Sequence, residues 1–184
     1  MTEPSSTAPP SLPFGLRWGI KSSFVEYIRR MPDGQGRLGA GAVPVGPLEV
    51  LYPPERGELH TLDDGSIERS WTFRGEVRFS GHFGMLVVRV AAPALTVRDG
   101  MAELSVADPS ATEDGQRLPL VTLRLDPQPA PDGIELWHGT DVRLTAAGTG
   151  LFNDVYPEGE PFESLTVTLP VLPPSGSAMP PAAT

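Results

Sequence analysis

Few side chains in this chain have the chemistry to form a functional site, and its three tyrosines and three histidines are the most informative of them. Tyr27 lies four residues after Ser23 in the segment Ser22–Met31. On a helix, side chains spaced in this way project on the same side. His82 lies in the segment Phe79–Met85 between two glycines, where missing side chains let another group approach the backbone closely. Tyr27 and His82 are therefore the first candidates for a functional site.

Each candidate also has an interpretation that needs no ligand. A tyrosine on an amphipathic helix is compatible with a core residue whose hydroxyl is hydrogen bonded. A histidine beside a strand is compatible with a satisfied core or edge residue. The other histidines, His60 in a polar loop and His138 at a strand end, are predicted to lie at the surface. Tyr52, before two prolines, is predicted to pack in a loop, whereas Tyr156 lies in a turn-rich stretch that suits the mouth of a pocket.

Several kinds of chemistry are excluded by what the sequence lacks. There is no cysteine, which excludes disulfides, thiolate metal sites and thiol nucleophiles. No two histidines have zinc-ligand spacing, and no Gly-x-Ser-x-Gly motif marks a nucleophile. The glycine-rich stretch 34–41 lacks the Lys-Ser/Thr end of a phosphate-binding loop and is predicted to be a flexible loop. The net charge of -9 argues against nucleic acid and anionic membrane surfaces as partners.

The two ends of the chain differ in composition from its middle. Both are rich in Pro, Ser, Ala and Thr, so we expect residues 1–13 and 173–184 to be disordered and residues 14–172 to form one domain. The first segment lacks the basic start and apolar centre of a secretory signal, and no apolar window approaches the ~18 residues of a membrane span. The sequence as printed predicts a cytoplasmic protein without membrane insertion, or an extracellular one if a signal was removed.

Between the ends, the dominant hydrophobic period is two, which is typical of β-strands. The alternation is clearest in Ser70–Gly81. Within Leu95–Val106, Asp99-Gly100 separates two alternating runs and predicts a hairpin with a two-residue type I′ turn. Further strands are predicted at Met85–Val90, Leu118–Leu125, Ile134–Trp137, Asp141–Ala146 and Leu165–Val171. Short strands separated by frequent turns predict a mainly β fold, an antiparallel sandwich or barrel with one or two short helices.

The exception to this pattern is Ser22–Met31, which has the period of a helix. Ser23 and Glu26 have the spacing of a capping box, in which each side chain satisfies a free backbone N–H at the helix start. One apolar stripe is formed by Phe24, Tyr27, Ile28 and Met31. Pro32–Gly34 then ends the helix. We expect a helix of about two to three turns packed onto the β core.

Three segments together resemble the HtaA haem-binding domain family of actinobacterial haem-uptake proteins. They are Leu16–Ile28 (LRWGIKSSFVEYI), Val77–Gly84 (VRFSGHFG), and Leu144–Glu160, in which LTAAGTGLF is followed by YPEGE. The family commonly has an arginine where this chain has Val25, and we expect no effect on the site. The sequence lacks the export signal and membrane anchor typical of the uptake proteins, so the expectation concerns haem binding rather than a role as a surface receptor.

The resemblance implies a mainly β fold and a haem whose iron is bound by the tyrosine of the helix, which is Tyr27 here. It implies that His82 supports this tyrosine by a hydrogen bond, and that Ser23 and Tyr156 hold the propionates. A phenolate is a hard anionic ligand that is stabilised by Fe(III), so the expected cofactor is ferric haem b. Candidates for the pocket wall are Phe24, Phe83, Met85 and Phe152, and candidates for screening the propionates are Arg17, Lys21 and Arg29.

The function expected from this resemblance is haem storage, buffering or transfer. The expected partners are haem and a protein that donates or accepts it. Two alternatives stay open at this point. The first is a haem-dependent peroxidase or catalase-like enzyme that uses the same tyrosine-ligated haem. The second is a binding module that uses the scaffold without haem.

Overall fold

The computed structural model describes residues 13–113 and 115–171. The two predicted disordered ends lie outside these residues, apart from Pro13. In the described part, antiparallel strands are joined by one α-helix and two short 3-10 helices. The predicted fold class, mainly β with short helices, is confirmed.

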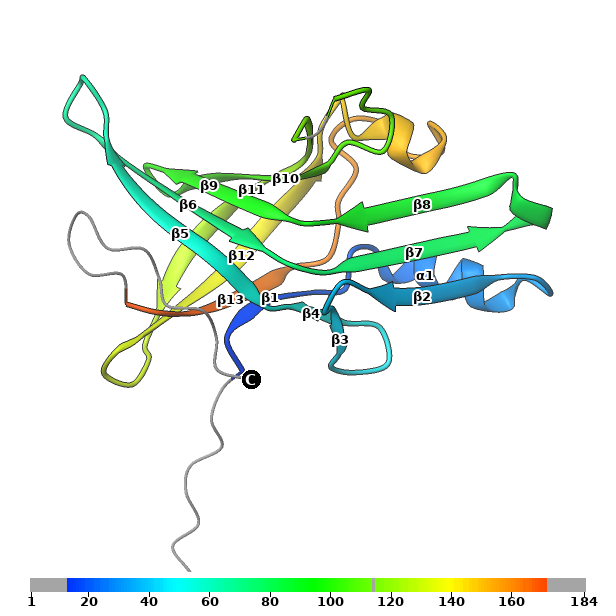
Figure 1. Cartoon of the computed structure of the whole chain (residues 1–184), viewed down its shortest axis with the longest axis horizontal. Helices are drawn as coiled ribbons and strands as arrows, with labels where there is room; N and C mark the ends of the chain where they lie inside the picture. The colour runs from blue at the N-terminus through cyan, green and yellow to red at the C-terminus, as the bar shows by residue number, and fades with distance from the viewer. Residues whose placement is uncertain (1–12, 114, 172–184) are drawn as a thin grey trace, which may run out of the picture.

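Ten strands form one sheet in which all neighbours are antiparallel (Figure 1). In order across the sheet they are β3 (Val43–Pro44), β4 (Val50–Tyr52), β1 (Gly15–Trp18), β13 (Leu165–Pro170), β12 (Ile134–Leu144), β11 (Arg117–Gln128), β10 (Met101–Ala107), β9 (Ala94–Arg98), β6 (Ile67–Phe73) and β5 (Pro54–Thr61). Only Pro53 separates β4, next to one edge, from β5 at the other edge. The sheet must therefore curve back on itself, like an incomplete barrel.

A second, three-stranded sheet is an extension of the first. Its strands are β2 (Gln35–Gly39), β7 (Glu76–Gly81) and β8 (Leu86–Ala91), with β7 in the middle. The chain runs from β6 directly into β7 and returns from β8 into β9, and the N–H of Ala92 donates to the carbonyl of Gly75 at 2.8 Å across this step. Gly75 has φ 126°, and a Cβ there would lie 2.9 Å from the Cβ of Ala42. The bend between the sheets therefore requires glycine.

Two predicted strand boundaries are wrong for the same reason, a local irregularity that the alternation does not reveal. The predicted strand Ser70–Gly81 is two strands separated by a bend at Gly75. The alternation does not reveal the bend, because the odd-numbered residues are buried on both sides of it. The predicted strands Ile134–Trp137 and Asp141–Ala146 are one strand, β12, which ends at Leu144. A β-bulge continues the pairing, since both Asp141 and Val142 lie opposite Leu123.

The predicted flexible loop at residues 34–41 is also wrong, because Gln35–Gly39 is strand β2, paired with β7. All five residues of β2 are exposed, so the sequence has no alternation to detect. Strands β1, β4 and β5 were not predicted either. Tyr52 is fully buried in β4 rather than in a loop, and His60 lies in β5, at the surface as expected.

Other predictions from the alternation are confirmed. The hairpin β9–β10 pairs Arg98 with Met101 around Asp99-Gly100, whose φ values of 51° and 76° suit a type I′ turn. His138 in β12 is exposed.

Burial raises the pKa of Tyr52, and its hydroxyl has no hydrogen-bond partner among the described residues. The core is one continuous cluster that includes the fully buried Trp18 and Trp71.

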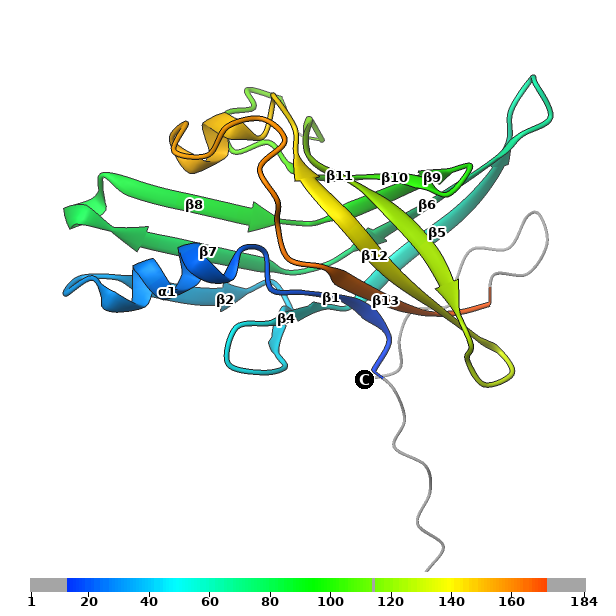
Figure 2. The same ribbon diagram turned by 180° about the vertical axis from the view of Figure 1, so that it is seen from behind.

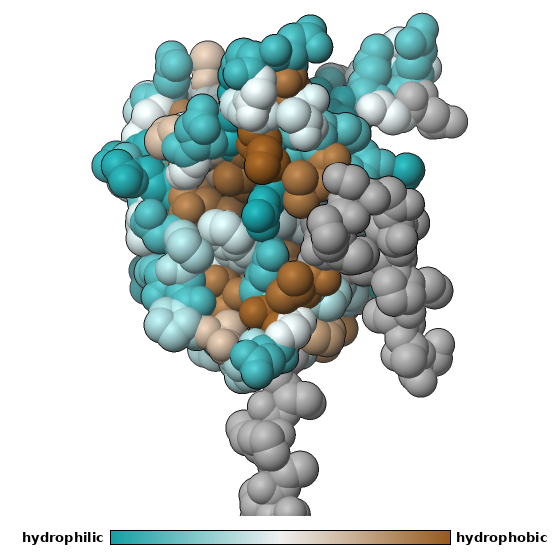
Figure 3. Space-filling view, turned by 90° about the vertical axis from the view of Figure 1, so that its left-hand side faces the viewer, coloured by the Kyte–Doolittle hydropathy of each residue, from teal (hydrophilic) through white to brown (hydrophobic). Residues whose placement is uncertain are grey.

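Helix α1 (Ser22–Arg30) lies against β2 and β7 of the smaller sheet (Figure 2). The opposite end of the molecule is formed by the hairpins β5–β6 and β9–β10, and Figure 3 shows apolar side chains reaching the surface there among hydrophilic ones. Ile67 and Met101, at the starts of β6 and β10, are each about half exposed. In residues 13–113 and 115–171, no helix has the length and apolar character needed to cross a membrane.

Candidate functional site

The helix that carries Tyr27 begins differently from the predicted capping box. The residue before α1 is Lys21, in extended backbone, and no side chain caps the helix there. The hydrogen bonds at the helix start come from Ser22 instead, whose hydroxyl and N–H donate to Oε1 of Glu163 at 2.6 and 3.1 Å. The predicted capping box of Ser23 and Glu26 is therefore wrong. Ser23 is the second helical residue, and its side chain is exposed.

The hydrogen bonds from Ser22 hold the pKa of Glu163 below its usual range. A carboxylate of this kind stabilises the folded state above its unfolded pKa of about 4.3, and the stabilisation is lost as the pH falls through the folded pKa. We expect Glu163→Gln to lower the free energy of unfolding by about 1 kcal/mol at pH 7, a low value because the group is partly solvated. Urea titrations measure this free energy, and the difference between Glu163→Gln and the wild type should shrink below about pH 4.

A matched control for Glu163 is available in the same connection between β12 and β13. Glu158 is exposed, so Glu158→Gln removes a charge without removing a helix contact. Its unfolding free energy should stay within about 0.5 kcal/mol of the wild type. If Glu163→Gln lowers the free energy of unfolding by the same amount at pH 7 and pH 3, the assigned role of the carboxylate is contradicted.

Helix α1 turns one face to the core and leaves Tyr27 at its margin. The buried side chains of the helix are Phe24, Val25 and Ile28. Phe24 packs edge-on against Phe79 and Phe152, with ring centroids 5.3 and 5.4 Å apart. Tyr27 is 48% exposed, so the predicted apolar stripe is correct for its buried members and Tyr27 lies at its edge. The helix thus fixes the position of a tyrosine whose hydroxyl is accessible.

His82 lies in a turn of left-handed backbone, the short helix η1 (His82–Gly84) between β7 and β8. The φ angles are 51° at His82, 54° at Phe83 and 88° at Gly84. The left-handed conformation costs a non-glycine residue about 1–2 kcal/mol, so contacts elsewhere must hold this turn. One of them is made by Asp33, whose Oδ2 accepts a hydrogen bond from the N–H of Phe83 at 2.6 Å.

Tyr27 and His82 meet although 55 residues separate them. Tyr27 Oη and His82 Nε2 are 2.7 Å apart and hydrogen bonded. The bond can run in two directions: a neutral tyrosine donates to the imidazole nitrogen, whereas a phenolate accepts from an imidazole N–H. The arrangement therefore suits either protonation state of the phenol.

The Tyr27–His82 pair lies in the wall of a mainly apolar pocket with a volume of about 320 Å³. The wall comes from three parts of the chain: α1, the turn η1 with the start of β8, and the segment that begins with the short helix η2 (Thr149–Phe152). Of the predicted wall residues, Phe24, Met85 and Phe152 line this pocket. Residues that line it and were not predicted are Leu86, Asn153 and Val155.

Phe83 is the predicted wall residue that the structure places elsewhere. It is 95% exposed and is not among the residues that line the pocket. The left-handed backbone of the turn leaves its side chain in solvent. The prediction for Phe83 is wrong, because alternation along a strand does not extend into such a turn.

Tyr156 lines the pocket and is half-buried. Its ring packs edge-on against Phe152 and Phe162, with centroids 5.8 and 6.2 Å apart, and the ammonium group of Lys21 lies 4.9 Å above it. Ser23, by contrast, does not line the pocket. The structure thus brings Tyr27, His82 and Tyr156 around one pocket and leaves Ser23 on the exposed surface of α1.

The three cationic candidates for propionate screening all have partners. Arg17 forms an ion pair with Glu49. Lys21 Nζ lies 2.7 Å from Oε1 of Glu160 and donates to a main-chain carbonyl. Arg29 donates to the carbonyl of Pro47. Arg17 and Lys21 each pair with a carboxylate, whereas Arg29 donates to a neutral carbonyl and keeps its charge unpaired by that contact.

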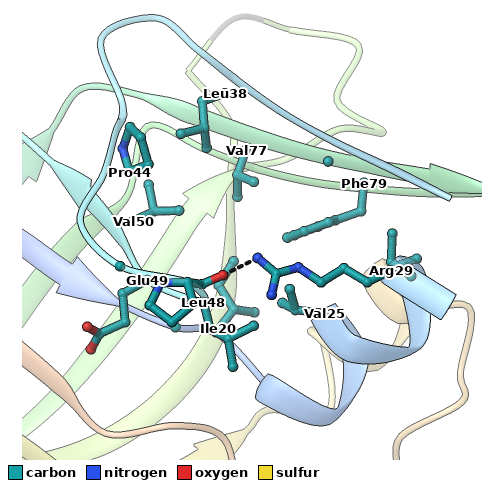
Figure 4. A pocket seen from close by; sticks show the side chains of 15 residues that line it. Ile20, Val25, Arg29, Leu38, Pro44, Leu48, Glu49, Val50, Val77 and Phe79 are labelled. Carbon is teal, nitrogen blue, oxygen red and sulfur yellow. Dashed lines mark hydrogen bonds between the residues drawn. The ribbon is translucent and has the colours of Figure 1, made fainter.

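A second pocket, of about 240 Å³, lies on the other side of α1 (Figure 4). Its apolar wall includes Val25, Val77 and Phe79, and the side chain of Arg29 extends across it toward the β3–β4 connection. Val25 therefore packs away from Tyr27. Arg29, a candidate for propionate screening, lines this second pocket, whereas Ser23, Tyr27, His82 and Tyr156 do not. Within the described part of the chain, no three or more His, Cys, Asp or Glu residues are grouped to hold a metal ion.

These features define a class of protein: an antiparallel β domain in which one short helix brings a half-exposed tyrosine to a histidine beside an apolar pocket. The family model described as Htaa matches residues 14–168. The chain therefore belongs to the HtaA family, as the three sequence segments predicted.

Solved structures of similar fold come from Corynebacterium glutamicum. The C-terminal domain of HtaA is 21% identical over 84% of this chain and 93% of that chain, with a TM-score of 0.65. The N-terminal domain of HtaA is 22% identical over 86% and 97%, with a TM-score of 0.64. The haem-binding protein HtaB is 18% identical over 84% and 91%, with a TM-score of 0.57. No curated sequence matches the chain.

Proposed function

We propose that this protein binds ferric haem b, with the phenolate oxygen of Tyr27 as axial ligand and His82 as its hydrogen-bond partner. The observation that carries the proposal is the 2.7 Å hydrogen bond between Tyr27 Oη and His82 Nε2 in the wall of an apolar pocket. Membership of the HtaA family and the fold shared with a haem-binding protein, HtaB, support it.

The chemistry of the pair suits ferric iron. A tyrosine ionises only at about pH 10 in water, so a metal cation and a hydrogen-bond donor must stabilise its phenolate at neutral pH. An imidazole N–H directed at the phenolate oxygen supplies that donor and fixes the orientation of the ring. A phenolate ligand favours Fe(III), which suits the capture and transfer of haem rather than reversible oxygen binding.

The pocket fits one part of a porphyrin. Ligand pockets usually measure about 300–1,000 Å³, so a pocket of 320 Å³ leaves an edge of a large flat ligand exposed. Met85 and Val155, which line the pocket and are 79% and 68% exposed, offer apolar surface to the ligand, at about 25 cal/mol per Å² buried. For the propionates we propose Tyr156 at the pocket and Ser23 in the first turn of α1, which contains no acidic residue of its own, although the carboxylate of Glu163 accepts the N–H of Ser22 there.

The role that follows is haem storage, buffering or transfer, with a haem-donating or haem-accepting protein as partner. A partly exposed ligand edge suits transfer, because a partner can contact the haem before it leaves the pocket.

An absorption titration with haemin tests the proposal. The purified protein should saturate with one haemin per chain and give the spectrum of high-spin ferric haem. Reduction with dithionite should weaken binding, since Fe(II) is a poorer partner for phenolate. Failure to take up haemin would reject the proposal and favour a binding module without haem.

The same haemin complex tests the enzyme alternative. A peroxidase needs a second acid or base facing the bound peroxide. The exposed His138 lies in β12 and does not line the pocket. Besides Tyr27 and His82, the polar side chains that line the pocket are Asn153 and Tyr156. Peroxide turnover with an electron donor should therefore not exceed that of free haemin. Turnover well above free haemin would favour the enzyme.

A further inference from the structure

The turn that carries His82 is held from one side by the segment that follows helix α1. Figure 2 shows the end of α1 and the tip of the β7–β8 hairpin at the same end of the molecule. The carboxylate of Asp33, three residues after the helix, accepts the N–H of Phe83 at 2.6 Å. Within the turn, the N–H of Met85 donates a backbone hydrogen bond to the carbonyl of His82 at 3.1 Å.

Close packing brings the two segments together just before His82. A Cβ added at Gly81 would lie 2.8 Å from Sδ of Met31 and 3.9 Å from Cα of Gly34. A Cβ added at Gly34 would lie 1.8 Å from the carbonyl oxygen of Ile28. Glycines at both positions therefore allow the turn after the helix to contact the end of β7, and this contact places Asp33 beside the turn.

The rest of the turn has little else to hold it. Phe83 is 95% exposed and Met85 is 79% exposed. Nothing lies within 4 Å of a Cβ built on Gly84. Two consecutive non-glycine residues in the left-handed region therefore depend on the hydrogen bond that the N–H of Phe83 donates to Asp33.

We infer that Asp33 is a positioning residue: its carboxylate holds the left-handed turn His82–Gly84 and thereby sets the hydrogen bond between His82 and Tyr27. Loss of the carboxylate lets φ of His82 and Phe83 return to negative values, which swings the imidazole away from the phenol. The consequence for haem affinity rests on the proposed function. The consequence for the turn itself does not, because it concerns the protein without haem.

The test compares Asp33→Ala, Asp33→Asn and a control, Asp64→Ala. Asn keeps an oxygen that can accept the N–H of Phe83, whereas Ala does not. Asp64 makes the same kind of contact, accepting the N–H of Ser66 at 3.0 Å, but it lies in the β5–β6 hairpin at the opposite end of the molecule (Figure 1). The control thus removes a hydrogen bond of this kind, together with the contacts of Asp64 with the Ser66 hydroxyl and Arg98, far from Tyr27.

The first readout uses the protein without haem. In Asp33→Ala, the three-bond coupling between the amide and Hα protons of Phe83 should change, and so should the chemical shift of the His82 side-chain nitrogen. Asp33→Asn should keep most of both signals, and Asp64→Ala should leave them unchanged. Unchanged signals in Asp33→Ala would overturn the inference, whether or not the protein binds haemin.

The second readout is haemin affinity. Asp33→Ala should weaken haemin binding by about 10–100-fold, the range expected when a partner of a metal ligand is removed. His82→Ala should cost a similar factor, and adding Asp33→Ala to His82→Ala should cost little more, because both act through the same hydrogen bond. A double variant whose losses multiply would show that Asp33 acts independently of His82. Absence of haemin binding by the wild type would reject the proposed function and leave the decision on Asp33 to the first readout.

Discussion

Replacing Tyr27 with phenylalanine should abolish the high-spin ferric spectrum of the haemin complex and weaken haemin binding at least about 100-fold. The substitution keeps the ring and removes only the oxygen that we propose as the iron ligand. Loss of a residue that merely supports a ligand costs about 10–100-fold, so loss of the ligand itself should cost more. Absorption titration with haemin measures both the affinity and the spectrum.

The matched control for Tyr27 is Tyr156→Phe, which removes a hydroxyl from the same pocket. The ring of Tyr156 packs against Phe152 and Phe162, and these contacts survive the substitution. We expect binding to weaken less than about tenfold, the value of one hydrogen bond of about 1 kcal/mol, with the spectrum unchanged. A wild-type spectrum in Tyr27→Phe, or a larger effect in Tyr156→Phe, would assign the iron ligand to another residue.

The sequence predicts the burial pattern of this fold better than its strand boundaries. The alternation from Trp71 to Gly81 is correct, because burial depends on which side of the chain a residue faces. The bend at Gly75 changes the direction of the chain, but the odd-numbered residues stay buried on both sides of it. Strand β2 could not be predicted from alternation, since its residues are all exposed and its pairing with β7 is set by segments far along the chain.

The start of α1 shows how a distant residue overrides a local signal. The spacing of Ser23 and Glu26 suits a capping box, which needs only four neighbouring residues. Glu163, 141 residues from Ser22, instead accepts both hydrogen bonds at the helix start. Because the β12–β13 connection brings Glu163 there, the helix begins without a local cap. No pattern within residues 22–26 contains that information.

The meeting of Tyr27 with His82 likewise could not be derived from the residues alone. Each has an ordinary interpretation as a core residue, and the resemblance to the HtaA family supplied their pairing. The left-handed turn that carries His82 has a glycine only at its last position, so the conformation leaves a weak signal in the sequence. The roles of Ser23, Tyr27, His82 and Tyr156 toward haem stay predictions.

Phe152→Ala should have the largest effect on folding of the substitutions considered, lowering the free energy of unfolding by about 3–5 kcal/mol. Its side chain is 1% exposed and lies at the centre of an aromatic cluster. The neighbouring rings are those of Phe24, Tyr156 and Phe162, all within 5.8 Å between centroids. Removing the ring leaves a cavity that the curved sheet and the helix can close only by shifting toward each other, away from their present packing. Urea unfolding measures the loss.

Phe83→Ala is the matched control, because it makes the same chemical change at a side chain that is 95% exposed. Its unfolding free energy should stay within about 0.5 kcal/mol of the wild type. Similar losses in the two variants would mean that the Phe152 cluster does not hold the pocket wall to the core. If the wall is held as described, Phe152→Ala should also weaken haemin binding, since Phe24 and Tyr156 lose the ring that fixes them, whereas Phe83→Ala should bind as the wild type does.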